Sequence, residues 1–275
     1  MKKIIYIFSI ICLLTYSKSS FAATDDTDKL QTAPWYKVYW GGFHIANLWT
    51  EITDGQIKAV IESYGLVKTL SKYESSTKSS YIKKDNRFLP AHFQTIFKQR
   101  HGSRSIDIKY NDSGNIKDEA VIPPDNRLKR PAVEDAKKKN AVDPLTAILV
   151  ARQKIKNGLK NGNDKFSINM YDGRRLSELD FTIYGKQQKT IKNRQYDVIK
   201  IDFKRLPIEG YTDNELKRFK SEEPVFTLYL EDNDLMLPIK AEADAPLGTA
   251  VLLMEKDCLT LSQCNGGKSQ KLAKK

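Results

Sequence analysis

The chain has 275 residues, of which 40% are hydrophobic and 29% are charged, and its net charge is +12. This length allows one large all-β domain or two small domains. After residue 22 no apolar run approaches the roughly eighteen residues of a membrane helix, which excludes a transmembrane anchor after processing.

The chain begins with the pattern of a secretory signal peptide in residues 1–22. Lys2 and Lys3 provide a positive start, and the apolar stretch that follows is too short for a stable membrane anchor. Ser20 and Ala22 are the small residues that signal peptidase requires. We therefore expect cleavage after Ala22.

An exported chain is expected to work in the periplasm, where nucleotide cofactors are absent. Cys12 lies inside the apolar stretch and follows Ile11, whereas the cysteine of a lipoprotein follows a small residue. The expectation is a periplasmic protein that is not a lipoprotein and has no cofactor. Residues 23–34 are expected to form a flexible segment before the folded domain.

Apolar and polar residues alternate from Trp35 onward, as in half-buried antiparallel strands. Gly41-Gly42 and Asp54-Gly55 mark tight turns between them. A weak helical pattern covers residues 66–73. The strands predicted in this first half are 36–40, 46–50, 57–61, 93–99 and 106–110.

Residues 123–140 are rich in proline and charge and are predicted to form a linker that leads into the main helix. Asp143 is a suitable N-cap, and Pro144 suits the first helical position. An apolar stripe that includes Leu149 and Ile155 follows, and Gly162 suits the end of the helix. We predict a helix over about 144–159, packed in the concavity of a sheet.

The second half again alternates with period two, and Asp172-Gly173 is a strong hairpin signal. A weak helical pattern covers residues 213–220. The strands predicted here are 166–170, 179–183, 199–203, 226–230, 235–241 and 249–255.

Together these runs predict a mainly β fold of about ten or eleven strands in one domain over residues 35–264. Because most strands are apolar on one face, we expect one long curved antiparallel sheet or an open barrel around the main α-helix. A sandwich of two sheets is the alternative.

Cys258 and Cys264 remain after removal of the signal peptide, and an even pair in an oxidising compartment predicts a disulfide. The chain after Cys264 is basic, and residues 265–275 are predicted to be a disordered tail.

The positive charge concentrates in that tail and in residues 125–140. This distribution fits loose attraction to anionic lipid, polysaccharide or peptidoglycan, and it does not indicate a nucleic-acid groove. The alternative is that these lysines only keep the linker and tail solvated.

Few residues have the type and spacing expected of a catalytic or metal-binding site. The three histidines, His44, His92 and His101, lie on separate segments without the spacing of metal ligands, and no familiar catalytic motif occurs. Glu178 and Asp180 could serve a glycosidase, but a solvated strand face is the better explanation for them. We therefore expect no enzyme activity.

Four residues are candidates for ligand binding: Trp40, Trp49, Arg174 and Arg175. The two tryptophans belong to a dense aromatic cluster that either lines a cavity or packs within one hairpin. The two arginines follow the Asp172-Gly173 turn, where they either bind a phosphate or carboxylate or face solvent.

Four stretches, Tyr36–Ile52, Asp143–Ile155, Tyr171–Phe181 and Pro224–Leu253, together resemble the exported proteobacterial family catalogued as domain of unknown function 3108. The resemblance implies a periplasmic protein with a curved antiparallel sheet and a helix in its hollow, similar in outline to lipoprotein carriers. It provides no catalytic residues. The basic tail and the Cys258–Cys264 pair depart from the family pattern.

We expect a non-enzymatic binding protein or carrier for an amphipathic ligand, such as a lipid or a lipoprotein-like ligand, or for an envelope partner. One alternative is an envelope-integrity scaffold that contacts peptidoglycan or anionic lipid through the tail. The other is a hydrolase with an unrecognised site. A dry cavity of several hundred Å3 would favour the carrier, and a filled core would favour the scaffold.

Overall fold

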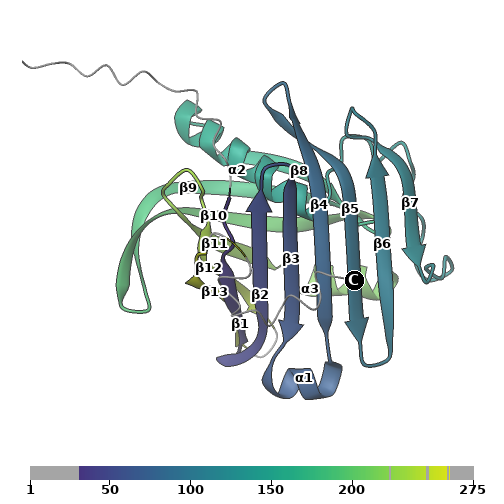
Figure 1. Cartoon of the computed structure of the whole chain (residues 1–275), viewed down its shortest axis with the longest axis horizontal. Helices are drawn as coiled ribbons and strands as arrows, with labels where there is room; N and C mark the ends of the chain where they lie inside the picture. Colours follow the sequence, from purple (N-terminus) through teal and green to yellow (C-terminus); the bar gives the residue numbers. More distant parts are fainter. Residues whose placement is uncertain (1–30, 223, 246–247, 259, 261–275) are drawn as a thin grey trace, which may run out of the picture.

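The computed structural model describes residues 31–222, 224–245, 248–258 and 260 (Figure 1). The predicted signal peptide with its cleavage after Ala22, most of the 23–34 segment, Cys264 and the 265–275 tail lie outside the described residues. The Cys258–Cys264 disulfide therefore stays a prediction.

The described part of the chain contains thirteen strands and three helices. The first seven strands are Trp35–Trp40 (β1), Phe43–Thr53 (β2), Gln56–Ser63 (β3), Glu74–Lys84 (β4), Arg87–Gln99 (β5), Gly102–Tyr110 (β6) and Ile116–Ile122 (β7). The other six are Lys165–Tyr171 (β8), Leu176–Ile191 (β9), Arg194–Glu209 (β10), Val225–Glu231 (β11), Pro238–Ala245 (β12) and Gly248–Lys256 (β13). The helices are Gly65–Ser71 (α1), Pro144–Asn161 (α2) and Asp213–Glu222 (α3).

All strands belong to one antiparallel sheet, in the order β7-β6-β5-β4-β3-β2-β1-β13-β12-β11-β10-β9-β8. It consists of two meanders, β1–β7 and β8–β13, which are joined by pairing of the first strand with the last. The sheet is open, since β7 and β8 form its two edges. This confirms the antiparallel, mainly β prediction.

The predicted count of ten or eleven strands was wrong because β4 and β7 lack an alternating pattern of apolar side chains. β4 (ESSTKSSYIKK) places Ser75, Thr77 and Ser79 opposite Ile61, Ala59 and Ile57 of β3. β7 (IKDEAVI) is an edge strand whose residues are mostly exposed. In neither strand do apolar and polar residues alternate with period two, which is the pattern that indicates a half-buried strand.

The sheet curls so that its two ends pack against each other. Phe93, Ile106 and Ile108 from β5 and β6 share one core cluster with Tyr171 and Leu176 from β8 and β9. The helix α2 contacts β3, β4, β5, β8 and β9, and so bridges the two halves (Figure 1). The linker before α2 and the helix itself therefore cover the gap between the open edges.

The start of α2 is fixed by a buried cap. The carboxylate of Asp143 accepts hydrogen bonds from the backbone nitrogens of Leu145 and Thr146, at 2.9 and 3.0 Å. It also accepts from the hydroxyls of Thr146 at 2.6 Å and Ser79 at 2.9 Å. The predicted cap is confirmed, and the bond from Ser79 ties α2 to β4.

The described residues include no helix with the length and apolar character needed to cross a membrane.

Candidate ligand-binding site

An apolar cleft of about 430 Å3 lies between α2 and the inner face of β8–β12. We call it the α2 cleft. Its helical wall includes Ala147, Ala151 and Ile155 of α2. The opposite wall consists mainly of large apolar side chains from the strands, including Phe203 and Leu228. The short side chains of Ala147 and Ala151 leave space beside the large residues of the sheet and so contribute to the cleft.

Four phenylalanines form a cross-strand row beside the cleft. Phe166, Phe181, Phe203 and Phe226 lie directly opposite one another on β8, β9, β10 and β11. Neighbouring ring centroids are 4.7, 5.3 and 4.7 Å apart, in stacked orientations. Phe181, Phe203 and Phe226 also line the α2 cleft. The row presents a rigid aromatic surface, since each ring is held by its neighbours across the strands.

The same row continues across the sheet to Trp40. Phe226 pairs with Ala243, Ala243 with Ala250, and Ala250 with Trp40. Directly paired residues in an antiparallel sheet project from the same face. Trp40 is therefore on the face that lines the α2 cleft, and two alanines leave little side-chain volume between them.

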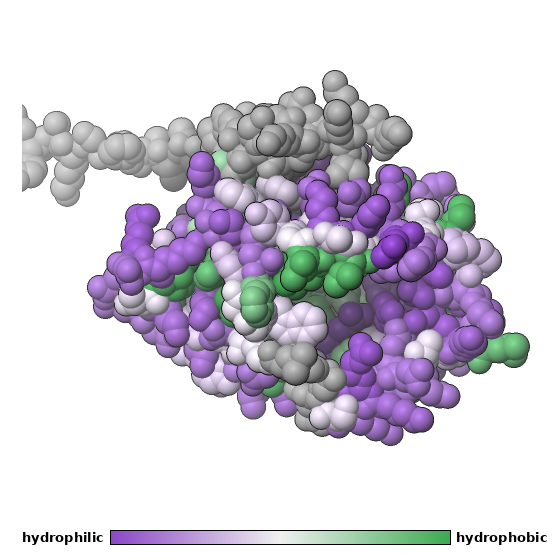
Figure 2. Space-filling view, turned by 90° about the horizontal axis from the view of Figure 1, so that it is seen from below, coloured by the Kyte–Doolittle hydropathy of each residue, from purple (hydrophilic) through white to green (hydrophobic). Residues whose placement is uncertain are grey.

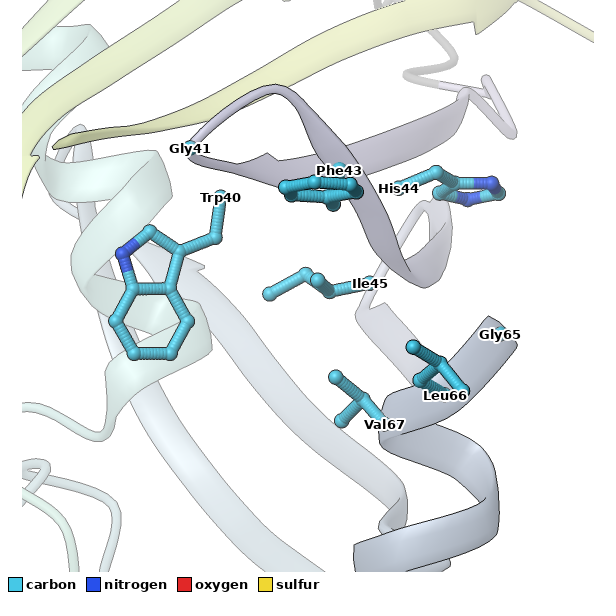
Figure 3. A pocket seen from close by; sticks show the side chains of 8 residues that line it. All are labelled: Trp40, Gly41, Phe43, His44, Ile45, Gly65, Leu66 and Val67. Carbon is cyan, nitrogen blue, oxygen red and sulfur yellow. The ribbon is translucent and has the colours of Figure 1, made fainter. Parts of the chain in front are cut away.

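A second apolar space of about 480 Å3 lies at the end of the molecule near α1. We call it the mouth pocket. The side chains of Trp40, Phe43, Ile45, Leu66 and Val67 point toward it, whereas His44 points away (Figure 3).

The rim of this pocket is strongly exposed, with Phe43 at 77% and Leu66 at 81% of their full accessible areas. Viewed from the α1 end, hydrophobic residues gather beside a hollow in an otherwise hydrophilic surface (Figure 2). Exposed apolar groups that cluster in this way mark sites where other molecules bind.

Arg152 is a cationic side chain on the apolar side of α2. It lines the α2 cleft and also a neighbouring space of about 310 Å3 beside β4 and β5. It is only 8% exposed, and its Nε and Nη1 atoms are buried without a hydrogen-bond partner. Burial lowers the pKa of its guanidinium group, whereas nearby Tyr36 and Tyr81 favour the charged form.

The candidates Arg174 and Arg175 are held by carboxylates. Arg174 donates from Nε and Nη2 to Asp125, at 2.8 and 2.6 Å. Arg175 donates from Nη2 to Glu215 at 2.5 Å and from Nη1 to Asp172 at 3.3 Å. Of the two expectations for these arginines, the one that they simply face solvent does not hold, because both groups belong to an ion-pair network at the seam between the two ends of the sheet. The carboxylates that they bind are the chain's own.

The network also explains part of the charged linker. Arg130 is 5% exposed, pairs with Glu215 at 2.8 Å and donates to the backbone oxygen of Gly210 at 2.5 Å. Lys138 is likewise buried and pairs with Glu119 and Asp135. These two cations of the 123–140 linker therefore hold it against the sheet, contrary to the expectation that its basic residues are solvated.

We expect the protein to lose stability in acid as the carboxylates of this network become protonated. Burial alone raises the pKa of Asp125, but hydrogen bonds from Arg174 and Arg104 outweigh this and lower it to about 2. Hydrogen bonds from Arg130 and Arg175 likewise outweigh burial and lower the pKa of Glu215. An aspartate in the unfolded chain has a pKa of about 3.9. Ionised Asp125 therefore stabilises the folded state fully above this pH, and this stabilisation is lost as the pH falls toward 2.

We therefore expect the urea midpoint to fall between pH 5 and pH 2, and to fall less steeply in Asp125→Asn, whose side chain does not titrate. Asp118→Asn is a matched control, because Asp118 pairs with Lys109 at an exposed position. Equal slopes in the wild type and in Asp125→Asn would contradict the prediction.

Trp49 lies away from both apolar spaces. Ile52 faces α2 in a core cluster with Leu145 and Leu149. Trp49 is three residues earlier on β2 and therefore projects from the other face, where it pairs with Trp35. Of the two tryptophan candidates, the structure places Trp40 at an apolar space and Trp49 in cross-strand packing.

The other candidate groups for chemistry are dispersed. His44 stacks on Tyr64, and His92 contacts Asp107 on neighbouring β6. Glu178 and Asp180 alternate with Leu179 and Phe181, which line the α2 cleft, so their side chains face away from it. Within the described ranges, no three or more His, Cys, Asp and Glu side chains are grouped closely enough to hold a metal ion.

Neither Arg152 nor the phenylalanine row was predicted from the sequence. A signal for Arg152 was present, since it lies four residues after Ile148 and three before Ile155, on the apolar stripe of α2. No local sequence pattern indicated the phenylalanine row, because the alignment of its four residues depends on the register in which the strands pair.

Comparison with known proteins gives a family match and a similar solved structure. A chain in the crystal structure of the β-barrel-like protein of domain of unknown function DUF1849 from Brucella abortus is similar to 83% of this chain, over 97% of its own length. The sequence identity is 7% and the TM-score is 0.48. No curated protein matches this chain. Residues 36–255 match the model of the family described as protein of unknown function (DUF3108), and the chain therefore belongs to that family.

Proposed function

We propose that the protein is a non-enzymatic binding protein of the cell envelope, which carries an amphipathic ligand in the hollow of its sheet. The observation that carries the proposal is the α2 cleft, an apolar space of about 430 Å3. Pockets for small molecules typically measure about 300–1,000 Å3 and are lined mainly by apolar and aromatic side chains.

The arrangement of apolar surface supports a carrier. The α2 cleft and the mouth pocket share the inner face of the sheet, connected by the row from Phe226 to Trp40. An apolar chain that lies along this row would exchange water for aromatic and aliphatic contacts. The exposed rim at Phe43 and Leu66 gives such a chain an apolar surface to contact as it enters.

The signal-peptide pattern in residues 1–22 supports a periplasmic location for this function. The scaffold alternative depends on the 265–275 tail, which lies outside the part of the chain that the structure describes. The carrier is therefore the function that the described residues support best.

Filling the α2 cleft is the direct test of this function. Leu228 lines the cleft on β11, and Leu228→Trp would place an indole where the ligand chain is expected. We expect this variant to bind a fluorescent long-chain fatty acid at least about tenfold more weakly than the wild type, a loss of about 1.4 kcal/mol. The measurement is a fluorescence titration of the purified mature chain.

Val225→Trp is the matched control, because Val225 lies on the same strand and its side chain projects from the opposite face. It should bind the probe as the wild type does, and circular dichroism should show that both variants are folded. If the wild type binds neither the probe nor any lipid detected by native mass spectrometry, the carrier function is wrong.

A further inference from the structure

Arg152 differs from the other buried cations among the described residues. Arg130 and Lys138 are similarly buried, and each forms at least two ion pairs. For Arg152, the described part of the chain supplies no ion pair and no acceptor for Nε or Nη1. A buried charge without a partner is unfavourable, so its presence in a folded protein calls for an explanation, and a ligand that completes the site is one.

The position of Arg152 shows where its missing partner would lie. The side chain borders the α2 cleft on one side and the space beside β4 and β5 on the other. That second space is also lined by Lys83 and Lys156 and by Asp54 and Asp234. Asp234 is already paired with Lys156, at 3.2 Å. The lining of this space holds three cations, with Arg152 counted, against two carboxylates, so its net charge favours an anionic group at Arg152. A chain attached to that group would extend into the apolar cleft.

We propose that Arg152 binds the anionic headgroup of a single-chain amphiphile, whose apolar chain occupies the α2 cleft. The inference rests on the proposed carrier function and narrows its ligand class to chains that end in a carboxylate or phosphate. Guanidinium groups bind both of these anions by charge-assisted hydrogen bonds, and such bonds are strong where water is excluded. The Nε and Nη1 atoms donate to the headgroup, and the phenylalanine row contacts the chain.

The test compares ligands that differ only in their headgroup. A neutral fluorescent probe is bound to the mature wild-type chain and then displaced in separate titrations with hexadecanoic acid, hexadecyl phosphate and hexadecanol. The affinity of each ligand is obtained from its displacement curve. We expect the two anionic ligands to bind about ten- to a hundredfold more tightly than the alcohol, as charge-assisted hydrogen bonds imply. In Arg152→Met this preference should disappear, while hexadecanol binds as it does to the wild type.

Lys160→Met is the control, because it removes a positive charge from the last turn of the same helix. It should keep the headgroup preference. Arg152→Met should also have a melting temperature equal to or above that of the wild type, because it removes a buried unpaired charge. If Arg152→Met does not fold, Arg152→Gln provides the same comparison, and failure of both variants to fold would assign Arg152 a structural role and overturn the inference.

The remaining outcomes separate the inference from the function on which it rests. If the wild type binds hexadecanol as tightly as hexadecanoic acid, the headgroup inference is wrong and the carrier function stands. If inorganic phosphate or acetate alone displaces the probe with the affinity of the long-chain anions, Arg152 binds a free anion and the amphiphile inference fails. If no long-chain compound binds, the carrier function itself is wrong.

Discussion

Replacing Gly210 by alanine is expected to destabilise the fold by about 4 kcal/mol, the sum of overpacking and left-handed backbone strain. Gly210 follows β10 and has a φ angle of +79°. An added Cβ would overlap the backbone oxygen of Arg174 and approach Cγ2 of Val133 to 2.7 Å. Neither neighbour can move freely, because Arg174 belongs to the ion-pair network and Val133 is a core residue.

Gly162→Ala separates the steric effect from the backbone effect. Gly162 ends α2 with a similar φ of +71°, and nothing lies within 4 Å of an added Cβ. We expect a cost of about 1 kcal/mol there, because only the left-handed conformation is penalised. Urea denaturation of both variants measures the difference, and equal losses would show that the contact at Gly210 relaxes without cost.

Replacing Asp143 by alanine is expected to cost about 3 kcal/mol, through loss of the helix cap and of partners for two buried hydroxyls. The Asp143 side chain is completely buried and accepts four hydrogen bonds at the start of α2. The hydroxyls of Ser79 and Thr146 lie 3.1 Å apart and can still bond to each other, which limits the loss. The free energy of unfolding from urea denaturation is the measurement.

Thr212→Ala is the matched control at the other capped helix. The Thr212 hydroxyl accepts from the backbone nitrogen of Glu215 at 3.3 Å, at the half-buried start of α3. We expect a loss of about 1 kcal/mol or less there, since water can replace the cap. If the two alanine variants lose the same stability, the buried contacts of Asp143 contribute little beyond the cap.

Features encoded locally were predictable from the sequence. Asp143 and Pro144 define the start of α2 by short-range rules, and Asp54-Gly55 and Asp172-Gly173 define turns by backbone preference. β4 escaped prediction because Ser79 faces inward, where its hydroxyl bonds to Asp143, 64 residues away. A polar residue at an inward position hides the strand period, and only the tertiary contact explains it.

The candidate site was predictable in part. Trp40 was identified from a cluster of aromatic residues, and it lines the mouth pocket. Arg174 was identified from its neighbours in the turn, but its partner Asp125 is 49 residues earlier in the chain. Arg152 resembles any arginine on a helix until the strands that bury it are known. The charge of a side chain is known from the sequence, whereas its distance from an oppositely charged partner is known only from the fold.

The pairing of β1 with β13 has a consequence for the order in which the protein folds. Each meander consists of strands close in sequence and can form from local hairpins. The α2 cleft is lined by α2 and the second meander alone, whereas its continuation toward the mouth pocket requires both meanders. Trp40 meets Ala250 only after nearly all of the described chain is available. Joining them closes a long loop, which is a slow, non-local step. A chain shortened before β13 would retain its hairpins but lack the strand pairing that joins the two meanders. The stretch of inner face from Ala243 through Ala250 to Trp40, which connects the α2 cleft with the mouth pocket, is therefore among the last parts of the molecule to form.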